Sequence, residues 1–243
     1  MIPKIIHQTY KTEDIPRRYK KYQERIKTLH SDFEYRFYTD ETMDVFMKKE
    51  FPKYYRKFND LPRMIMKIDM FRYFLMYKCG GLYADMDYLF FKKFDLLKND
   101  VVLPCRMPIN NVKIGSLLGN CVFASVPGHP FWKSAIDTLF IVDRNTKTEE
   151  SDKIEDGAVA DHINGTGPAF LTHIWEQFED KTGIITPDRK LFSPGVPRRL
   201  AFMTGESGIK QREKYIFERE TKYTNMGTYG IHVCYGEWRN GNL

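Results

Sequence analysis

Residues 67–87 read KIDMFRYFLMYKCGGLYADMD, and this stretch decides the fold. We expect a helix here, with Asp60 as its N-cap and Pro62 in its first turn. The pair Gly80 and Gly81 should end the helix, because glycine commonly follows a helix C-terminus. A short strand over residues 82–84 should come next and lead into an Asp-X-Asp triplet.

One face of the expected helix is apolar. Met66, Met70, Tyr73 and Tyr77 recur at offsets of four, three and four, a spacing that gathers side chains on one side of a helix. We therefore expect this face to pack against the core of the protein.

Two pairs of charged side chains in this stretch are spaced for a joint role. Asp69 and Arg72 are three residues apart, so they can pair or hold a polar ligand together, with an exposed ion pair as the alternative. Asp85 and Asp87 would project from the same side of an extended backbone. Two close carboxylates are costly to keep ionised unless a cation joins them, and oxygen ligands suit Mn²⁺ or Mg²⁺. The triplet thus predicts a divalent metal that holds a phosphorylated substrate, with a solvated turn as the alternative.

The order of elements before this stretch predicts an α/β protein. A strand over residues 4–8, in which His7 should be a core histidine, is followed by an amphipathic helix over 19–29. Alternating residues over 33–38 predict a second strand, and a helix should open at Thr42. This strand–helix alternation is typical of parallel βαβ units.

The second half of the chain gives fewer signals. Residues 143–162 are polar without periodicity, which favours a surface loop, and residues 187–228 are basic and turn-rich. Alternation after residue 230 puts His232 on the face opposite Ile231 and Val233, so His232 is a candidate to point into a site. Other elements are expected as strands at 101–104, 121–124 and 231–235, with helices beginning at Pro130 and Pro168.

The composition bounds the class of protein. With 243 residues, the chain is long enough for one large domain with its own core. A net charge of +6 and a pI near 9.0 would suit an anionic ligand such as a nucleotide diphosphate, and would also suit nucleic acid or an anionic membrane. Because the charge is spread widely, we interpret it as solubility and anion attraction and expect no nucleic-acid partner. No apolar run is long enough to span a bilayer, so we expect a cytoplasmic protein without a transmembrane segment, with a membrane anchor outside these residues as the alternative.

Five segments together resemble the Asp-X-Asp glycosyltransferases of family 32, the group that includes the yeast initiating α-1,6-mannosyltransferases. They are IPKIIHQTY at 2–10, the stretch at 67–87, NCVFASVPGHPF at 120–131, TGP at 166–168 and HVCYGEW at 232–238. The glucosyltransferase domain of large clostridial toxins is similar more distantly. The resemblance implies a glycosyltransferase A-type fold, a Rossmann-like mixed sheet flanked by helices, as a single domain over 1–243. Residues 1–90 would form the nucleotide-binding half, and residues 91–243 the acceptor half with a C-terminal lid.

The resemblance also implies roles for the charged residues. Asp87 would bind the metal directly, and Asp85 would reach the ribose or the sugar, partly through the metal. His232 would complete the metal shell, for which imidazole suits Mn²⁺ better than Mg²⁺. Asp69 and Arg72 would bind the donor-sugar hydroxyls and the diphosphate.

Further donor contacts are implied at the end of the first strand and at three other positions. They are Gln8, Thr9, Tyr10, Tyr83, Asn120 and Trp238. Tyr83 has a core residue as its alternative, and Asn120 a turn asparagine. Trp238 would reach the diphosphate from the closing lid, where Glu237 replaces the serine that the family commonly has.

These observations predict a metal-dependent enzyme that moves a sugar from a UDP- or GDP-sugar to a glycan or other hydroxyl acceptor, with retention of anomeric configuration. Two other classes are alternatives. A haloacid-dehalogenase-type phosphatase also uses Asp-X-Asp, but on its first strand and followed by Thr or Val where this chain has Leu89. A non-catalytic carbohydrate or nucleic-acid binder fits the basic, aromatic composition and leaves the aspartates unexplained.

Overall fold

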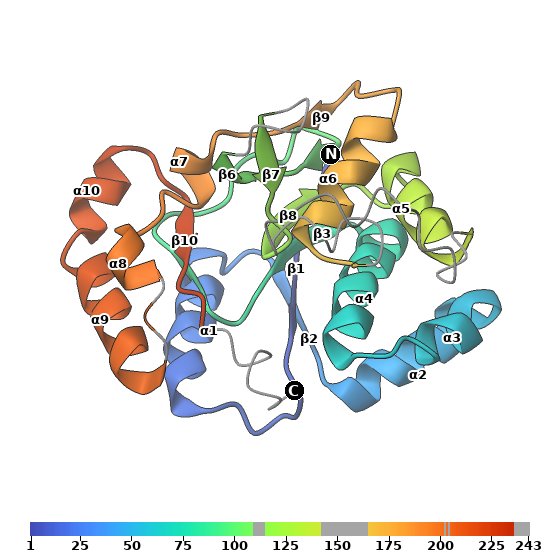
Figure 1. Ribbon diagram of the computed structural model, residues 1–243, viewed down its shortest axis with the longest axis horizontal. Helices are drawn as coiled ribbons and strands as arrows, with labels where there is room; N and C mark the ends of the chain where they lie inside the picture. Colours follow the sequence, from blue (N-terminus) through green and yellow to red (C-terminus); the bar gives the residue numbers. More distant parts are fainter. Residues whose placement is uncertain (109–114, 142–164, 202, 204, 236–243) are drawn as a thin grey trace, which may run out of the picture.

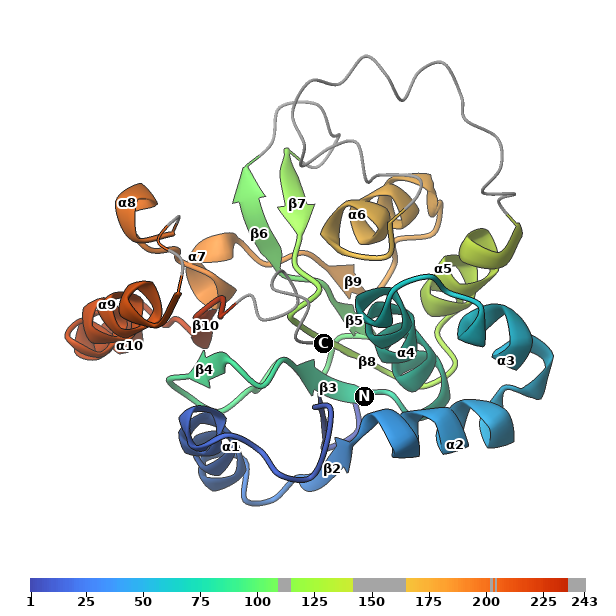
Figure 2. The same cartoon turned by 60° about the horizontal axis from the view of Figure 1, so that its bottom comes forward.

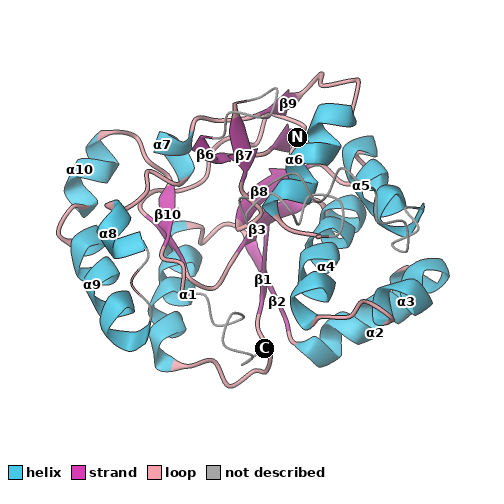
Figure 3. Ribbon diagram, viewed as in Figure 1, coloured by secondary structure: helices cyan, strands magenta, loops and turns pink. Residues whose placement is uncertain are grey.

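The computed structural model describes residues 1–108, 115–141, 165–201, 203 and 205–235, and a mixed sheet lies at its centre (Figure 1, Figure 3). In spatial order its strands are β2 (Glu34–Tyr38), β1 (Ile5–Thr9), β3 (Gly81–Ala84), β8 (Val122–Ser125), β5 (Val101–Val102) and β9 (Ile184–Ile185). β1 is parallel to both β2 and β3, whereas β8 is antiparallel to β3 and β5. The parallel pairing of β1 with β2 confirms the predicted βαβ unit.

Helices cover both faces of this sheet (Figure 2). Along β3, Tyr83 lies in one core and its neighbours Leu82 and Ala84 lie in the other, as strand alternation requires. The first core is covered by α2 (Asp40–Glu50), α3 (Pro52–Asn59), α4 (Met64–Cys79), α5 (Pro130–Ile141) and α6 (Pro168–Gln177). The second is covered by α1 (Arg17–Leu29) and α7 (Arg189–Phe192). This Rossmann-like mixed sheet flanked by helices is the glycosyltransferase A-type fold predicted from the sequence.

The helix α4 differs from its prediction at its start and in its burial. Pro52 opens a separate helix, α3, so Asp60 follows the end of that helix and is not the N-cap of α4. The cap position of α4 is Arg63. The expected apolar stripe is too narrow a description, because every residue from 69 to 76 is buried. This part of α4 is buried on all sides because α3, α5 and the sheet enclose it.

The glycine pair that ends α4 is confirmed. Gly80 has φ +62° and Gly81 has φ +95°, values that favour glycine. Space is also tight, because a Cβ on Gly81 would lie 2.6 Å from the carbonyl oxygen of Ile5. The pair therefore lets α4 turn directly into β3 against β1.

Two small sheets lie beside the central one. The strand β4 (Tyr88–Phe90) pairs antiparallel with β10 (Gly230–His232), and β6 (Cys105–Pro108) pairs antiparallel with β7 (Ser116–Leu118). The pairing of β4 with β10 brings the far end of the described chain next to the Asp-X-Asp triplet.

Residues 187–228 are more regular than their turn-rich composition indicated. They hold α7, α8 (Arg198–Ala201), α9 (Gly205–Phe217) and α10 (Glu220–Asn225). The buried side of α9 includes Gly208 and Arg212 together with Ile216, so an apolar periodicity is hard to detect there. α2 likewise begins earlier than expected, because Thr39 is its N-cap and Thr42 completes a capping box.

Most other predicted elements agree with the structure, but the strand expected over 231–235 is found only over residues 230–232. α5 and α6 begin at Pro130 and Pro168, and strands lie at the positions expected near 101 and 122. The predicted loop over 143–162 lies outside the described residues. In the described part of the chain, no helix is long and apolar enough to cross a membrane.

Candidate metal and donor-binding site

The Asp-X-Asp triplet lies in a turn between β3 and β4. Asp85 directly follows β3, and its carbonyl oxygen accepts a 3.0 Å hydrogen bond from the Tyr88 N–H. The prediction of an extended backbone through the triplet is therefore wrong. The two carboxylates still converge, because His232 approaches both of them from β10.

Asp87 is enclosed by hydrogen-bond donors from the end of β10. Its Oδ1 is 2.8 Å from His232 Nε2, and its Oδ2 accepts a 2.8 Å bond from the Tyr235 N–H. Burial acts to raise the pKa of Asp87, but His232 and the donated hydrogen bonds hold it below its usual value. Burial acts to lower the pKa of His232, and Asp87 raises it well above 6.5. The solvated-turn alternative is excluded, since Asp87 is only 9% exposed.

Asp85 joins this pair to the buried middle of α4. Its Oδ2 lies 3.7 Å from His232 Nε2, while its Oδ1 accepts a 2.9 Å bond from the Tyr83 hydroxyl and lies 3.2 Å from Arg72. Burial raises the pKa of Asp85 despite the opposing effect of Arg72. One ligand atom from each of Asp85, Asp87 and His232 lies within 4.8 Å of the others. The structure thus brings together the three residues predicted as metal ligands.

A second polar network surrounds Asp69 on α4. Its carboxylate accepts 3.0 Å hydrogen bonds from Asn120 Nδ2 and Thr166 Oγ1, and it lies 3.4 Å from Arg72. Asp69 and Arg72 are each 6% exposed, so they do not form the exposed ion pair considered as the alternative. Burial raises the pKa of Asp69 to about 6, and Arg72 opposes this rise. Arg72 also donates a 2.7 Å bond to the Asn120 carbonyl oxygen, which links this network to the loop before β8.

A residue near the end of β1, Gln8, forms hydrogen bonds to the backbone at the start of the triplet. Gln8 is fully buried, and its amide donates 3.3 Å bonds to the carbonyl oxygens of Ala84 and Asp85. Its Oε1 accepts a 2.9 Å bond from the Tyr35 hydroxyl. The Gln8 side chain therefore holds the turn in place from inside the protein. Thr9 and Tyr10, the next two residues, are partly exposed.

Tyr83 combines a core position with a polar contact in the site. Its ring stacks on Phe123 at 5.3 Å, and the Arg72 guanidinium lies 4.9 Å from the ring centre. Its hydroxyl lies 3.0 Å from Thr9 Oγ1 and donates to Asp85. The core interpretation and the site interpretation of Tyr83 are thus compatible.

Several residues around the site were not identified from the sequence. Thr166 lies within a matching segment, yet nothing in its spacing indicates a bond to Asp69. Arg212 donates to the Val233 carbonyl and the Tyr235 N–H donates to Asp87, and both contacts arise from tertiary structure. By contrast, the predicted Trp238 and its neighbour Glu237 lie outside the described residues.

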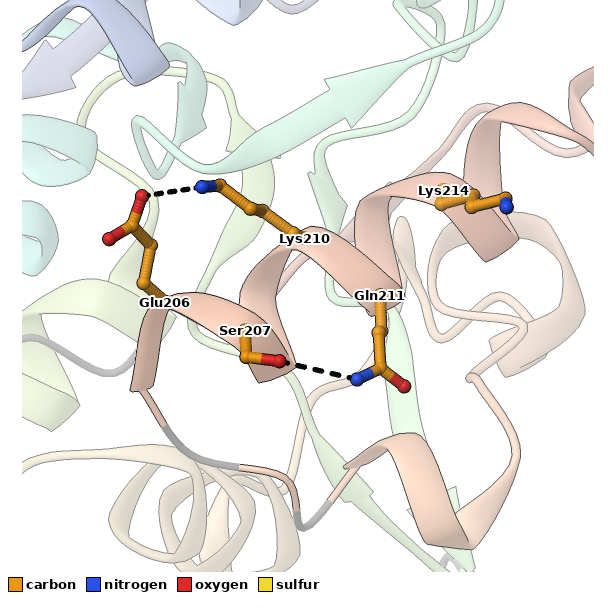
Figure 4. A pocket seen from close by; sticks show the side chains of 5 residues that line it. All are labelled: Glu206, Ser207, Lys210, Gln211 and Lys214. Atoms are coloured by element: carbon orange, nitrogen blue, oxygen red, sulfur yellow. Dashed lines mark hydrogen bonds and ion pairs between the residues drawn. The ribbon is translucent and has the colours of Figure 1, made fainter.

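A surface pocket elsewhere lies along α9 (Figure 4). Its lining consists of Glu206, Ser207, Lys210, Gln211 and Lys214. Glu206 pairs with Lys210 at 2.8 Å, and Gln211 donates to Ser207 at 3.3 Å. These are exposed side chains of one helix, one turn apart, and they include none of the three converging metal-ligand candidates. The pocket is a separate surface feature.

Comparison with known proteins assigns the region around the triplet. Residues 16–103 match the family model for a glycosyltransferase sugar-binding region containing a DXD motif. Mannosyl phosphorylinositol ceramide synthase SUR1 of Saccharomyces cerevisiae is 36% identical over 74% of this chain and 43% of its own length. The initiation-specific alpha-1,6-mannosyltransferase of Candida albicans is 30% identical over 38% of this chain and 26% of its own length.

A solved structure, PaToxG glycosyltransferase, aligns with 72% of this chain and 69% of its own at a TM-score of 0.47 and 16% identity. The chain spans less than half the length of the two curated relatives, at 43% and 26%. The resemblance found in the sequence is confirmed by the family match and by these relatives. Residues 16–103, which include the Asp-X-Asp triplet, are thus similar to the sugar-binding region of glycosyltransferases that contain a DXD motif.

Proposed function

We propose that this chain transfers a sugar from a nucleotide-diphosphate sugar to a hydroxyl acceptor, with a divalent metal held by Asp85, Asp87 and His232. The observation that supports this most directly is the convergence of these three side chains within 4.8 Å. Two carboxylates and an imidazole suit Mn²⁺, whereas Mg²⁺ prefers an all-oxygen shell. A bound metal would offset the negative charge that grows on the departing nucleoside diphosphate.

Arg72 is proposed to contact the diphosphate. Its guanidinium is buried between Asp85 and Asn120, and its Nε has no hydrogen-bond partner among the described residues. A buried N–H without a partner is unusual and would be satisfied by a phosphate oxygen. A fixed cation here would stabilise the leaving group without reorganisation.

Asp69 is proposed to accept a hydrogen bond from a hydroxyl of the donor sugar. Asn120 and Thr166 hold its two oxygens in place, which fixes the direction from which a ligand can approach. Thr9 and Tyr10 are assigned to the nucleotide and Trp238 to the diphosphate, as the family resemblance implies. We propose likewise that residues 1–90 form the nucleotide-binding half and residues 91–243 the acceptor half.

The sugar and the acceptor are proposed from the relatives. The name of the Saccharomyces cerevisiae relative contains a mannosyl group and a phosphorylinositol ceramide. We therefore propose mannose as the first donor sugar to test and a phosphorylated inositol headgroup as the first acceptor. Retention would need no general base on the acceptor, because the leaving phosphate can take the proton, so no residue is assigned that role.

The test is a panel of UDP- and GDP-sugars, GDP-mannose included, assayed for Mn²⁺-dependent release of the sugar to water and then for transfer to inositol phosphates. We expect one donor to be hydrolysed with Mn²⁺ and spared with excess chelator. Release of phosphate from simple phosphomonoesters, without cleavage of any nucleotide sugar, would instead support the phosphatase alternative.

A further inference from the structure

We infer that Arg212 is a positioning residue for the metal site. It holds the peptide groups of Val233 and Cys234 in the conformation that lets His232 and Tyr235 contact Asp87 together. The inference rests on the function proposed above and extends it to a residue on α9 that contacts none of the three metal-ligand candidates.

Asp87 receives three contacts from four consecutive residues. His232 Nε2 lies 2.8 Å from its Oδ1, and the Tyr235 N–H donates to its Oδ2 at 2.8 Å. The Val233 N–H donates to the Asp87 backbone carbonyl at 3.0 Å. Residues 232–235 must therefore curl around Asp87, since an extended strand could not present all three groups to one residue.

Cys234 makes this curl possible at a conformational cost. Its φ is +61°, and it is the non-glycine residue with positive φ in the described part of the chain. The left-handed region is unfavourable for a residue with a Cβ, so such a conformation persists only where surrounding contacts impose it.

Arg212 supplies those contacts through its guanidinium group. It is 4% exposed, and its Nε donates to the Val233 carbonyl at 3.1 Å while its Nη2 donates to the Cys234 carbonyl at 3.0 Å. Its Nη1 donates to the carbonyl oxygens of Leu200 and Met203 at 3.2 and 2.5 Å. The guanidinium fork thus connects the two peptides that flank the strained Cα to the carbonyl oxygens of Leu200 and Met203, which precede α9 in the chain.

The first measurement needs no metal. Amide hydrogen exchange of the metal-free protein should show Val233 and Tyr235 as protected in the wild type. Arg212→Met should lower that protection about tenfold or more relative to the amides of β1, because only the segment held by Arg212 is released. The matched control is Leu139→Ala, which creates a cavity in the core covered by α4, α5 and α6. It should lower global stability without a specific loss of protection at Val233 and Tyr235.

The second measurement is Mn²⁺ affinity, determined below the unfolding temperature of each variant. Arg212→Met should weaken binding about 10- to 100-fold, the usual effect of removing an outer-shell partner, whereas Leu139→Ala should bind normally. Adding Cys234→Gly to Arg212→Met should restore part of the affinity, since glycine adopts φ +61° freely. Cys234→Ala, which also removes the thiol but keeps a Cβ, should restore none.

The outcomes separate this inference from the proposed function. Protected amides and unchanged Mn²⁺ affinity in Arg212→Met would overturn the role of Arg212 and leave the metal site intact. A wild type that binds no Mn²⁺ would overturn the proposed function, while exposed Val233 and Tyr235 amides in Arg212→Met would still support the positioning role. If Arg212→Met does not fold, Arg212→Lys takes its place, because a single ammonium cannot reach both flanking carbonyls and should show the same losses in weaker form.

Discussion

His232 Nε2 lies 2.8 Å from Asp87 Oδ1, although the two residues are 145 positions apart in the chain. The pairing of β4 with β10 produces this contact, because it places His232 opposite Tyr88, the residue that follows Asp87. The metal-ligand set is thus completed by tertiary structure, and its binding properties should be coupled to the stability of the β4–β10 sheet.

Mn²⁺ should stabilise the folded protein. An ion that binds the folded chain and not the unfolded one adds about 2.7 kcal/mol to the free energy of unfolding at 100 times its dissociation constant. Thermal unfolding with increasing Mn²⁺ measures this, and sugar release should vanish in excess chelator and return best with Mn²⁺. Full sugar release in the presence of the chelator would contradict a metal-dependent reaction.

Asp87→Asn should lower donor hydrolysis at saturating Mn²⁺ by on the order of 10²–10³, or ~3–4 kcal/mol, because a preorganised charge is removed from the leaving-group side. The variant should also unfold more easily without metal, by about 1–3 kcal/mol, since Asp87 is buried and accepts bonds from His232 and Tyr235. Turnover and denaturant unfolding measure the two effects separately.

The matched control is Asp32→Asn. Asp32 is an exposed carboxylate paired with Lys4 and Lys93, remote from the triplet in its contacts. Its loss should leave turnover unchanged. Wild-type turnover in Asp87→Asn would remove Asp87 from the mechanism.

Much of the fold was predictable because local rules agree with the final structure. The glycines after α4 and the prolines that open α5 and α6 each act within a few residues. The addition of His232 to the pair of Asp85 and Asp87 was expected only from the family resemblance, because spacing in the chain does not say which strands pair.

The missed features share a physical cause, which is that polar groups can be buried when the fold supplies partners. Gln8 was assigned to the nucleotide, but its amide is satisfied inside the protein by Ala84, Asp85 and Tyr35. Arg212 is likewise buried against carbonyl oxygens, so the buried face of α9 has no apolar periodicity in the sequence. A pattern of apolar residues cannot reveal such positions.

His7 should make the protein less stable as the pH falls below 6.5. Burial lowers its pKa to about 4, so the unfolded chain takes up a proton between pH 6.5 and 4 while the folded protein does not. This group alone should cost about 2 kcal/mol between pH 7.5 and pH 5. Urea unfolding at the two pH values measures the loss, and His7→Gln, which can still donate to the Gly80 carbonyl, should show a loss smaller by that amount. An equal loss in the two proteins would show that His7 does not titrate as its burial requires.

Asp69 should set the acid limb of donor use. Burial raises its pKa to about 6, so the carboxylate gains a proton as the pH falls through 6 and then accepts a sugar hydroxyl poorly. At saturating Mn²⁺, kcat/KM for the donor should therefore decline below pH 6, and Asp69→Asn should be slow but lack this decline.

Thr166→Val gives the sharper test of the same group. The Thr166 hydroxyl donates to Asp69 and lowers its pKa, so its removal should move the midpoint of the acid limb to higher pH. Thr172→Val is the matched control, because Thr172 is an equally buried threonine of α6 that bonds the Leu118 N–H and the Pro168 carbonyl and does not touch Asp69. It should lower stability and leave the midpoint in place. An acid limb that shifts equally in both variants, or in neither, would mean that a group other than Asp69 controls it.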